Sequence, residues 1–162
     1  MVPVYLGLGS NIDPEENLRL GIRELRRIFG EIELSAVYSN AAIGFDGADF
    51  LNMVVRLQSA DSPRAIQSQA ESIHVLAGRD RNSDKFSSRP LDIDLLLYGD
   101  ELIDEPGLKL PRCDVLDFSF VLRPLVELDP DLMHPGTGKT MAEHWQAFDA
   151  GLHPLRPVDL IL

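Results

Sequence analysis

The sequence predicts an α+β fold in which helices pack on one face of a mostly antiparallel sheet. Three observations lead to this prediction. Two segments place apolar residues at helical spacing, four others have the composition or alternation of strands, and their order along the chain is β-α-β-β-α-β. That order is typical of the ferredoxin-like sandwich.

The first three predicted elements lie within the N-terminal forty residues. An apolar run, Val2–Leu8, predicts a buried strand. A helix is predicted over 14–29, with proline at its first position, Asp13 as its N-cap and Glu16 placed to complete a start that resembles a capping box. Alternating apolar and polar residues over 32–37 then predict a half-buried strand.

The central part of the chain supplies the other half of the fold. Asn40–Asp49 is predicted to be a loop because it holds two glycines, and 50–57 predicts a strand. A helix is predicted over 62–78, starting at a Ser-Pro pair and ending at a glycine. The polar segment 79–90 predicts a long loop, and Leu91–Tyr98 predicts the next strand.

The remaining sequence is less regular. Pro106-Gly107 breaks the chain, and a helix is predicted over 115–128 with a bend near Pro124. A short last helix is predicted over 142–148. No repeat or linker divides the chain, so a single domain spanning 1–162 is expected.

Composition and charge exclude several classes of protein. The chain has 162 residues, of which 44% are hydrophobic, and a net charge of −11, from 15 Lys+Arg against 26 Asp+Glu. Broad neutralisation of nucleic-acid phosphates is therefore not expected. No apolar run reaches the roughly 18 residues that cross a bilayer, so no membrane partner is expected either. Cys113 stands alone, which favours a reducing, cytoplasmic location.

Two aspartates on the last predicted strand of the fold form a candidate metal site. Asp92 and Asp94 are two residues apart, and residues at that spacing on a strand point to the same face. A divalent cation would relieve the repulsion of two such carboxylates, and Mg²⁺ prefers one or two carboxylates plus water and substrate phosphates. The alternative is that both side chains merely decorate a solvated face of the sheet.

The loop before these aspartates carries a local positive charge. Its four cations and two anions give +2, while the rest of the chain carries −13. The cations are Arg79, Arg81, Lys85 and Arg89. Arginine and lysine can neutralise phosphate oxygens, and phosphoryl-type transfer depends on such positioning and neutralisation. The alternative is a solvated loop whose charges pair locally.

Aromatic residues suggest a site for a flat ligand. Phe50 shares a strand face with Asn52, whose amide can bind the edge of a heterocycle, while Phe86 lies in the cationic loop and Phe120 on the late helix. Rings on both sides of a ligand allow stacking. The alternative for Phe50 and Phe120 is ordinary core packing.

Two other motifs are rejected. The segment 136–140 ends like a phosphate-binding P-loop, but Met133 stands where the first glycine is required. The glycines of 7–11 lack the third glycine of a dinucleotide fingerprint and are interpreted as a strand-to-helix turn. The four histidines show no metal-ligand spacing.

With these residues in view, the chain resembles the 6-hydroxymethyl-7,8-dihydropterin pyrophosphokinase family over about residues 4–135. The resemblance rests on motifs that occur in the family's order: YLGLGSN (5–11), FLN (50–52), GRDR (78–81), SRPLDIDLLLYG (88–99) and FVLRPLVELDPDLMHP (120–135). It implies a ferredoxin-like fold and transfer of pyrophosphate from ATP to the hydroxymethyl group of the pterin, with release of AMP.

The resemblance also implies roles for individual residues. Two Mg²⁺ ions would be held by Asp92 and Asp94, and the phosphates clamped by Arg79 and Arg89. The implied ATP-binding residues are Arg81, Lys85, Arg112, His74 and Ile93. The implied pterin-binding residues are Asn52, Phe50, Phe120, Phe86, Ile43 and Asn40.

This chain departs from the family's usual pattern at four places. It has Asn40–Gly44 where the family has a Thr-Pro motif, Arg112 where histidine is usual, Phe118 in place of an arginine, and His74 in place of a glutamate. Two alternative functions therefore stay open. One is a diverged paralogue that acts on a different heterocyclic acceptor, and the other is a non-enzymatic ligand-binding module on the same fold.

Overall fold

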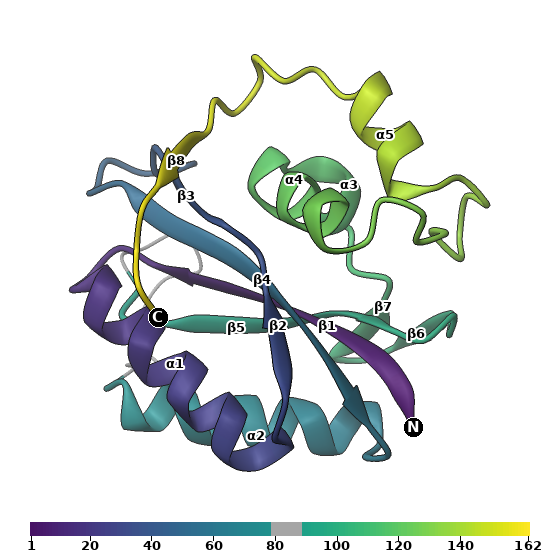
Figure 1. Ribbon diagram of the computed structural model, residues 1–162, viewed down its shortest axis with the longest axis horizontal. Helices are drawn as coiled ribbons and strands as arrows, with labels where there is room; N and C mark the ends of the chain where they lie inside the picture. Colours follow the sequence, from purple (N-terminus) through teal and green to yellow (C-terminus); the bar gives the residue numbers. More distant parts are fainter. Residues whose placement is uncertain (79–88) are drawn as a thin grey trace.

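A computed structural model describes residues 1–78 and 89–162 and confirms the predicted α+β class (Figure 1). Six strands form one antiparallel sheet in the order β5-β1-β4-β3-β8, and β2 also pairs with β4. These strands are β1 Val2–Ser10, β2 Ile32–Leu34, β3 Val37–Asn40, β4 Phe50–Ser59, β5 Asp92–Tyr98 and β8 Arg156–Val158. The central position of β1 between β4 and β5 is the order expected of a ferredoxin-like sandwich.

The helices cover both faces of the sheet rather than one (Figure 1). The helices α1 (Pro14–Phe29) and α2 (Pro63–Leu76) lie on one face, while α3 (Asp114–Asp117), α4 (Ser119–Leu128) and α5 (Met141–Ala147) lie on the other. Alternate residues of the strands therefore fill two cores. The prediction of helices on one face was incomplete, because the C-terminal third of the chain supplies a second layer.

Residues of β1 show how the two cores divide. Val4, Leu6 and Leu8 pack in the core under α1 and α2, whereas Tyr5 packs in the core under α4. Each of these four side chains is at most 2% exposed. Because strand residues alternate between faces, Gly7 and Gly9 continue the Tyr5 face.

The second predicted strand is interrupted by a bulge. Leu34 pairs with Val55 but Tyr38 pairs with Asn52, so one extra residue lies between them on this strand. Ser35 occupies the interruption and accepts a hydrogen bond from the Val54 amide at 2.9 Å. The bulge shifts by one residue which side chains of β3 face each side of the sheet. The predicted strict alternation of apolar and polar side chains over 32–37 was therefore wrong.

The start of α1 and the course of the late helix differ from prediction in one respect each. The helix α1 has the predicted bounds and Asp13 stands at its N-cap position, but Asp13 adopts a left-handed backbone (φ 43°) and makes no side-chain cap bond, so the predicted capping box is wrong. A capping side chain reaches the first-turn amides from extended backbone, which Asp13 lacks. The late helix is broken at Phe118, whose backbone is extended, while Pro124 lies within α4. The predicted bend at Pro124 is therefore replaced by a break six residues earlier.

Three short strands were not predicted. β6 (Ile103–Glu105) and β7 (Leu108–Leu110) form a hairpin whose turn has Gly107 at φ 75°. The strand β8 pairs with β3 at the edge of the main sheet. Within residues 1–78 and 89–162, none of the helices combines the length and apolar composition that crossing a bilayer requires.

A polar network ties the end of α4 to the sheet. The Tyr5 hydroxyl donates to Asp129 Oδ2 at 2.8 Å, and Arg56 pairs with Glu33 at 2.6 Å and with Asp129 at 3.4 Å. Burial, followed by the hydrogen bond to Asp129, raises the pKa of Tyr5 to about 12. The neutral phenol is therefore the form that the folded protein stabilises.

We expect Tyr5→Phe to lower the free energy of unfolding at pH 8 by about 1 kcal/mol, because it removes one hydrogen bond from the network. The folded-state pKa lies above the unfolded value of 10.0, so the phenol's contribution is complete below pH 10 and is lost as the pH rises toward 12. Urea unfolding of both proteins at pH 8 and pH 11.5 measures this. A penalty that does not shrink at pH 11.5 would contradict the assignment.

Candidate active site

A cavity of about 190 Å³ lies on the sheet face beneath α3 and α4. Strands β1, β3, β4 and β5 form its floor, and α3 and α4 form one wall. It brings together eight of the residues expected from the sequence, namely Asn40, Ile43, Phe50, Asn52, Arg89, Asp92, Asp94 and Phe120. Four other expected residues, Arg79, Arg81, Lys85 and Phe86, lie outside the described residues.

One end of the cavity carries two buried amides. Asn52 of β4 donates from Nδ2 to Asn40 Oδ1 of β3 at 2.6 Å, and Asn40 donates to the carbonyl of Ala41 at 3.0 Å. The Asn40–Asn52 bond uses one of the two amide hydrogens of Asn52. Its second hydrogen and its carbonyl oxygen are groups that can bind the edge of a heterocycle in the cavity.

Two glycines of β1 make this arrangement possible. A Cβ at Gly9 would lie 2.5 Å from Asn52 Oδ1, and a Cβ at Gly7 would lie 3.3 Å from the Leu96 side chain. Both glycines lie within β1, which continues to Ser10, so the strand-to-helix turn predicted at 7–11 was wrong for all but Asn11. Gly9 is required because the amide of Asn52 packs directly on its backbone.

Aromatic rings line the cavity from two sides. Phe50 comes from β4, and Phe120 comes from α4. Phe118 stacks on Phe120 with ring centroids 4.9 Å apart and an interplanar angle of 16°, and Phe45 meets Phe50 edge-on at 6.2 Å. Phe45 and Phe118 were not predicted as site residues, although Phe45 lies in the glycine-containing loop beside the predicted Ile43.

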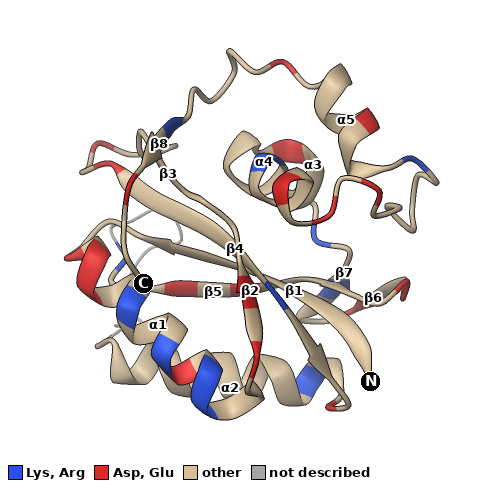
Figure 2. Ribbon diagram, in the orientation of Figure 1, with Lys and Arg blue, Asp and Glu red and all other residues tan. Residues whose placement is uncertain are grey.

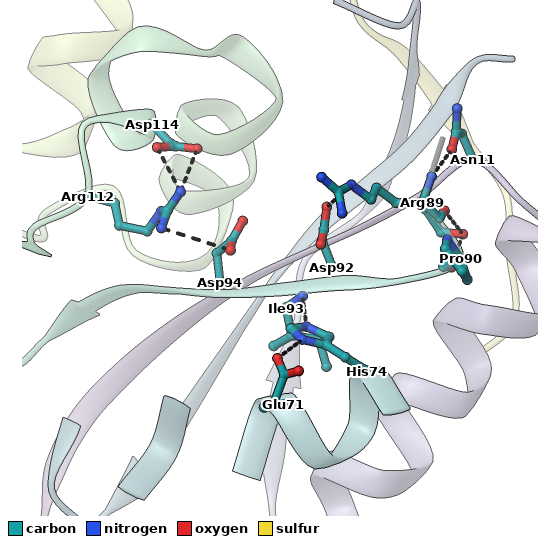
Figure 3. Close-up of polar contacts among 11 residues, drawn as sticks. Asn11, Glu71, His74, Arg89, Pro90, Asp92, Ile93, Asp94, Arg112 and Asp114 are labelled. Carbon is teal, nitrogen blue, oxygen red and sulfur yellow. Dashed lines mark hydrogen bonds and ion pairs between the residues drawn. The ribbon is translucent and has the colours of Figure 1, made fainter. Parts of the chain in front are cut away.

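Carboxylates gather on the β5 side of the cavity. Figure 2 shows acidic positions on β5 and on α3, and Figure 3 shows the side chains that lie between these two elements. Asp92 and Asp94 emerge from β5 toward α3, which supplies Asp114. Arg89 Nε lies 4.0 Å from Asp92 Oδ2, and Arg112 Nη1 lies 4.0 Å from Asp94 Oδ1. Asp114 was not predicted, because no sequence pattern links it to the Asp92–Asp94 pair.

The Asp92–Asp94 pair suits Mg²⁺ better than a fully protein-bound metal. Within the described residues, no group of three or more His, Cys, Asp or Glu side chains is arranged to hold a metal. Mg²⁺ commonly takes one or two carboxylates and completes its octahedron with water and substrate phosphates. The donor set therefore fits a metal that arrives with a polyphosphate.

The electrostatics of Asp94 favour a bound cation. Burial in the cavity wall raises the pKa of Asp94, the charge of Arg112 opposes this rise, and Asp92 and Asp114 add to it. A carboxylate that is costly to ionise alone is stabilised in its charged form by a divalent cation.

A second, more open hollow of about 450 Å³ lies along the outer edge of β5. It is bounded by α2 and by the β6–β7 hairpin, and its lining includes the expected residues His74, Ile93 and Arg112. Asp94 and Asp114 line both this hollow and the first cavity. Two ligands bound in the two spaces would therefore meet at these carboxylates.

His74 links α2 to the edge of β5 (Figure 3). Its Nε2 accepts a hydrogen bond from the Ile93 amide at 2.8 Å, and its Nδ1 lies 3.0 Å from Glu71 Oε2. Since Nε2 accepts, the ring proton belongs on Nδ1, where it can be donated to Glu71. The ring thus fixes the backbone between Asp92 and Asp94.

We expect His74→Leu to destabilise the fold by about 1–3 kcal/mol, because it leaves the Ile93 amide without its acceptor. His74→Gln should recover at least half of this loss, since its side-chain oxygen can accept the same bond. Urea unfolding of the three proteins measures the difference. Equal losses in the two variants would show that packing, rather than the hydrogen bond, is what His74 provides.

The backbone of Arg89 is held by the end of β1 (Figure 3). Its amide donates to Asn11 Oδ1 at 2.7 Å, and its carbonyl accepts from the Asn11 amide at 3.0 Å. Asn11 Nδ2 also donates to the Ala48 carbonyl at 3.1 Å. Asn11 therefore connects Arg89 with the loop that carries Ile43 and Phe45, a role that was not predicted.

Fold and site together define a class of protein: a ferredoxin-like α+β sandwich whose two adjoining cavities share a pair of carboxylates. A family model described as 7,8-dihydro-6-hydroxymethylpterin-pyrophosphokinase (HPPK) matches residues 5–130. The chain belongs to this family.

Similar proteins agree with this assignment. The 2-amino-4-hydroxy-6-hydroxymethyldihydropteridine pyrophosphokinase of Aquifex aeolicus is 35% identical over 145 residues, which cover 88% of this chain and 90% of that protein. The protein of the same name from Synechocystis sp. is 35% identical over 156 residues, covering 94% and 80%.

Longer proteins contain a similar region. The folic acid synthesis protein fol1 of Pneumocystis carinii is 32% identical over 95% of this chain, but this chain spans only 21% of it. The solved structure of Plasmodium falciparum HPPK-DHPS matches with a TM-score of 0.70 and 12% identity, over 91% of this chain and 43% of that one. At that identity the structural match shows the fold alone.

Proposed function

We propose that the chain transfers pyrophosphate from ATP to the hydroxymethyl group of 6-hydroxymethyl-7,8-dihydropterin, with release of AMP, in folate biosynthesis. Membership of the family identifies the chain as a pyrophosphokinase, and enzymes of this family use ATP as co-substrate. One observation in the structure carries the assignment of the two substrates: Asp94 and Asp114 line both cavities. The transfer would take place at this junction.

The first cavity is proposed to hold the pterin. Asn52, positioned by Asn40, would bind the edge of the ring, and Phe50 and Phe120 would stack on its faces. Ile43 lines the same cavity, and Phe86 is proposed to close over the ligand. This arrangement supports a flat, polar-edged acceptor, because amides and aromatic rings converge on one space.

The second hollow is proposed to hold ATP. His74, Ile93 and Arg112 line it, and Arg79, Arg81 and Lys85 are proposed to reach the phosphates from the preceding loop. Arg89, 7% exposed and held by Asn11, keeps a fixed positive charge beside Asp92.

In the proposed reaction the pterin hydroxyl oxygen forms a bond to the β-phosphorus of ATP. The bond from that phosphorus to the oxygen that bridges it to the α-phosphorus breaks, that oxygen leaves with AMP, and the hydroxyl proton passes to water. Asn52 orients the acceptor, and Arg79 and Arg89 stabilise the charge that develops on transfer. Asp92 and Asp94 would hold two Mg²⁺ ions, which supply charge neutralisation of the phosphates when bound.

The test is to incubate the protein with ATP, Mg²⁺ and the hydroxymethyl-dihydropterin, and to quantify AMP and pterin pyrophosphate. We expect equal amounts of the two products, and little AMP when the pterin is omitted. Absence of AMP above background would overturn the proposal. Magnesium-dependent AMP release would in turn exclude a non-enzymatic binding module.

One observation favours a second candidate, transfer to a different heterocycle. Phe118, which stands where the family usually has an arginine, stacks on Phe120 in the wall of the acceptor cavity. A thermal-shift panel of pterins and related heterocycles distinguishes the two, because a bound ligand raises the unfolding temperature. A selective response to the hydroxymethyl-dihydropterin would exclude the second candidate.

The unit and place of action are also proposals. We propose that residues 1–162 act as one domain, because both cavities are built by the single sheet and the helices on it. A cytoplasmic location is proposed because the lone Cys113 suits a reducing compartment.

A further inference from the structure

Arg112 lies between two carboxylates at the junction of the two cavities (Figure 3). Its Nη1 is 4.0 Å from Asp94 Oδ1, and its Nη2 is 3.3 Å from Asp114 Oδ1 and 3.4 Å from Asp114 Oδ2. The Arg112 amide donates to the Leu96 carbonyl at 3.0 Å, so the base of the side chain is tied to β5. The guanidinium can therefore shift its position between two acceptors while its backbone stays in place.

The guanidinium also has donor capacity that these contacts do not use. Within the described residues, Arg112 Nε is buried and has no hydrogen-bond partner. The side chain as a whole is 40% exposed and lines the second hollow. An anion that enters this hollow would gain a hydrogen-bond donor and a positive charge at the same place.

Two ligands of opposite charge would affect Arg112 in opposite ways. A cation that approaches Asp94 is repelled by the guanidinium beside it. Like charges only a few ångströms apart repel strongly enough near a protein surface to lower the affinity for the cation. A phosphate group in the second hollow attracts the guanidinium away from Asp94. Asp114 offers the guanidinium an ion pair that does not involve Asp94.

We propose that Arg112 is an internal counter-ion of Asp94 that makes metal binding depend on the polyphosphate, and that Asp114 is the positioning residue that holds Arg112 clear of Asp94. This inference rests on the proposed function, because it assumes that the metal at Asp94 and the nucleotide phosphates share one site. It assigns a role to Asp114, which enters the site only through the folding of α3 onto the sheet.

The test measures Mn²⁺ binding by electron paramagnetic resonance, first with the metal alone and then with a non-hydrolysable ATP analogue. Arg112→Met is expected to bind Mn²⁺ alone about tenfold more tightly than the native protein, since it removes the competing charge. Asp114→Asn is expected to bind Mn²⁺ alone about fivefold more weakly, since Arg112 then pairs with Asp94. The control Lys109→Met removes a positive charge from the lining of the same hollow and should change the affinity less than about twofold.

The double variant separates this mechanism from simple charge removal. If Asp114 acts by holding Arg112, Asp114→Asn should weaken Mn²⁺ binding by less than about twofold once Arg112 is methionine. If Asp114 acts only through its own charge, Asp114→Asn should weaken Mn²⁺ binding about fivefold both in the native protein and in Arg112→Met. Additive effects, or an Arg112→Met protein that binds Mn²⁺ no more tightly than the native one, would overturn the inference.

Two further readouts keep the outcomes distinct. Circular dichroism melting identifies a variant that does not fold, in which case Arg112→Gln replaces Arg112→Met in the same cycle. Additive effects together with normal binding of Mn²⁺ and the ATP analogue would overturn this inference alone. Failure of every protein to bind Mn²⁺ even with the analogue would overturn both the inference and the proposed function.

Discussion

Asp94→Ala is expected to abolish pyrophosphate transfer while leaving the fold intact. Asp94 lines both cavities, and its carboxylate is the group that a metal between the two substrates would need. Removing one of the two proposed ligands of a metal that neutralises the transferred phosphate group should lower kcat by about a thousandfold or more. The measurement is AMP release at saturating ATP, Mg²⁺ and pterin.

The free energy of unfolding of Asp94→Ala should equal or exceed that of the native protein. The only ion pair of Asp94 in the described residues is a 4.0 Å contact with Arg112, and burial raises the pKa of its carboxyl, so the alanine variant loses no strong stabilising contact. The matched control is Asp104→Ala, which removes an exposed carboxylate from the β6–β7 hairpin. Full activity in Asp94→Ala, or equal losses in the two variants, would refute the placement of the reaction at this junction.

Gly9→Ala is the second substitution expected to have a large effect. It tests the proposed binding of the pterin in the first cavity without removing a polar group. The new methyl carbon would lie 2.5 Å from Asn52 Oδ1, so the amide must move away from its position beside Asn40. Displacing a group that is proposed to hydrogen-bond the acceptor should weaken pterin binding by about 30-fold or more. Fluorescence titration of the pterin measures the affinity, and AMP release measures the KM.

Gly7→Ala supplies the matched control on the same strand and the same face. Its methyl carbon would lie 3.3 Å from the end of the Leu96 side chain, which can shift by a few tenths of an ångström. We expect less than about a threefold change in pterin affinity, because Leu96 is a flexible aliphatic side chain. Equal effects of the two substitutions would mean that crowding of β1, rather than displacement of Asn52, weakens binding.

The helices and strands that were predicted from the periodicity of apolar residues are present in the structure. The apolar spacing over 14–29 and the Ser-Pro start of the second helix correspond to α1 and α2, and the Ser62 hydroxyl accepts the Ala65 amide at 3.2 Å. The strands over 50–57 and 91–98 also formed, as β4 and β5. Helical and strand periodicity depend on which side of each element is buried, and the spacing of apolar residues within a short stretch of sequence reveals that side.

Local sequence gave wrong answers where a tertiary contact replaced a local one. At Ser35 a hydrogen bond to β4 admits an extra residue and reverses the alternation of the strand. At Phe118 the chain leaves α3 and begins α4 so that this ring can stack on Phe120 over the sheet. Neither contact leaves a signal in the neighbouring residues.

The candidate site divides in the same way. The two-residue spacing of Asp92 and Asp94 placed both carboxylates on one face, and the same argument paired Phe50 with Asn52. The predictions for Arg79, Arg81, Lys85 and Phe86 remain predictions, since those residues lie outside the described part of the chain.

The sequence by itself therefore determined the order of elements, the paired carboxylates, the amide on β4 and the family. Only the tertiary structure decided that Asp114 faces Asp94, that Gly9 carries the amide of Asn52 and that Asn11 holds Arg89. These pairs are separated by 20 to 78 residues along the chain, and they are set by sheet register and by the docking of α3. The physical reason is that periodicity records which face of an element is buried, whereas the identity of the partner depends on how distant elements pack.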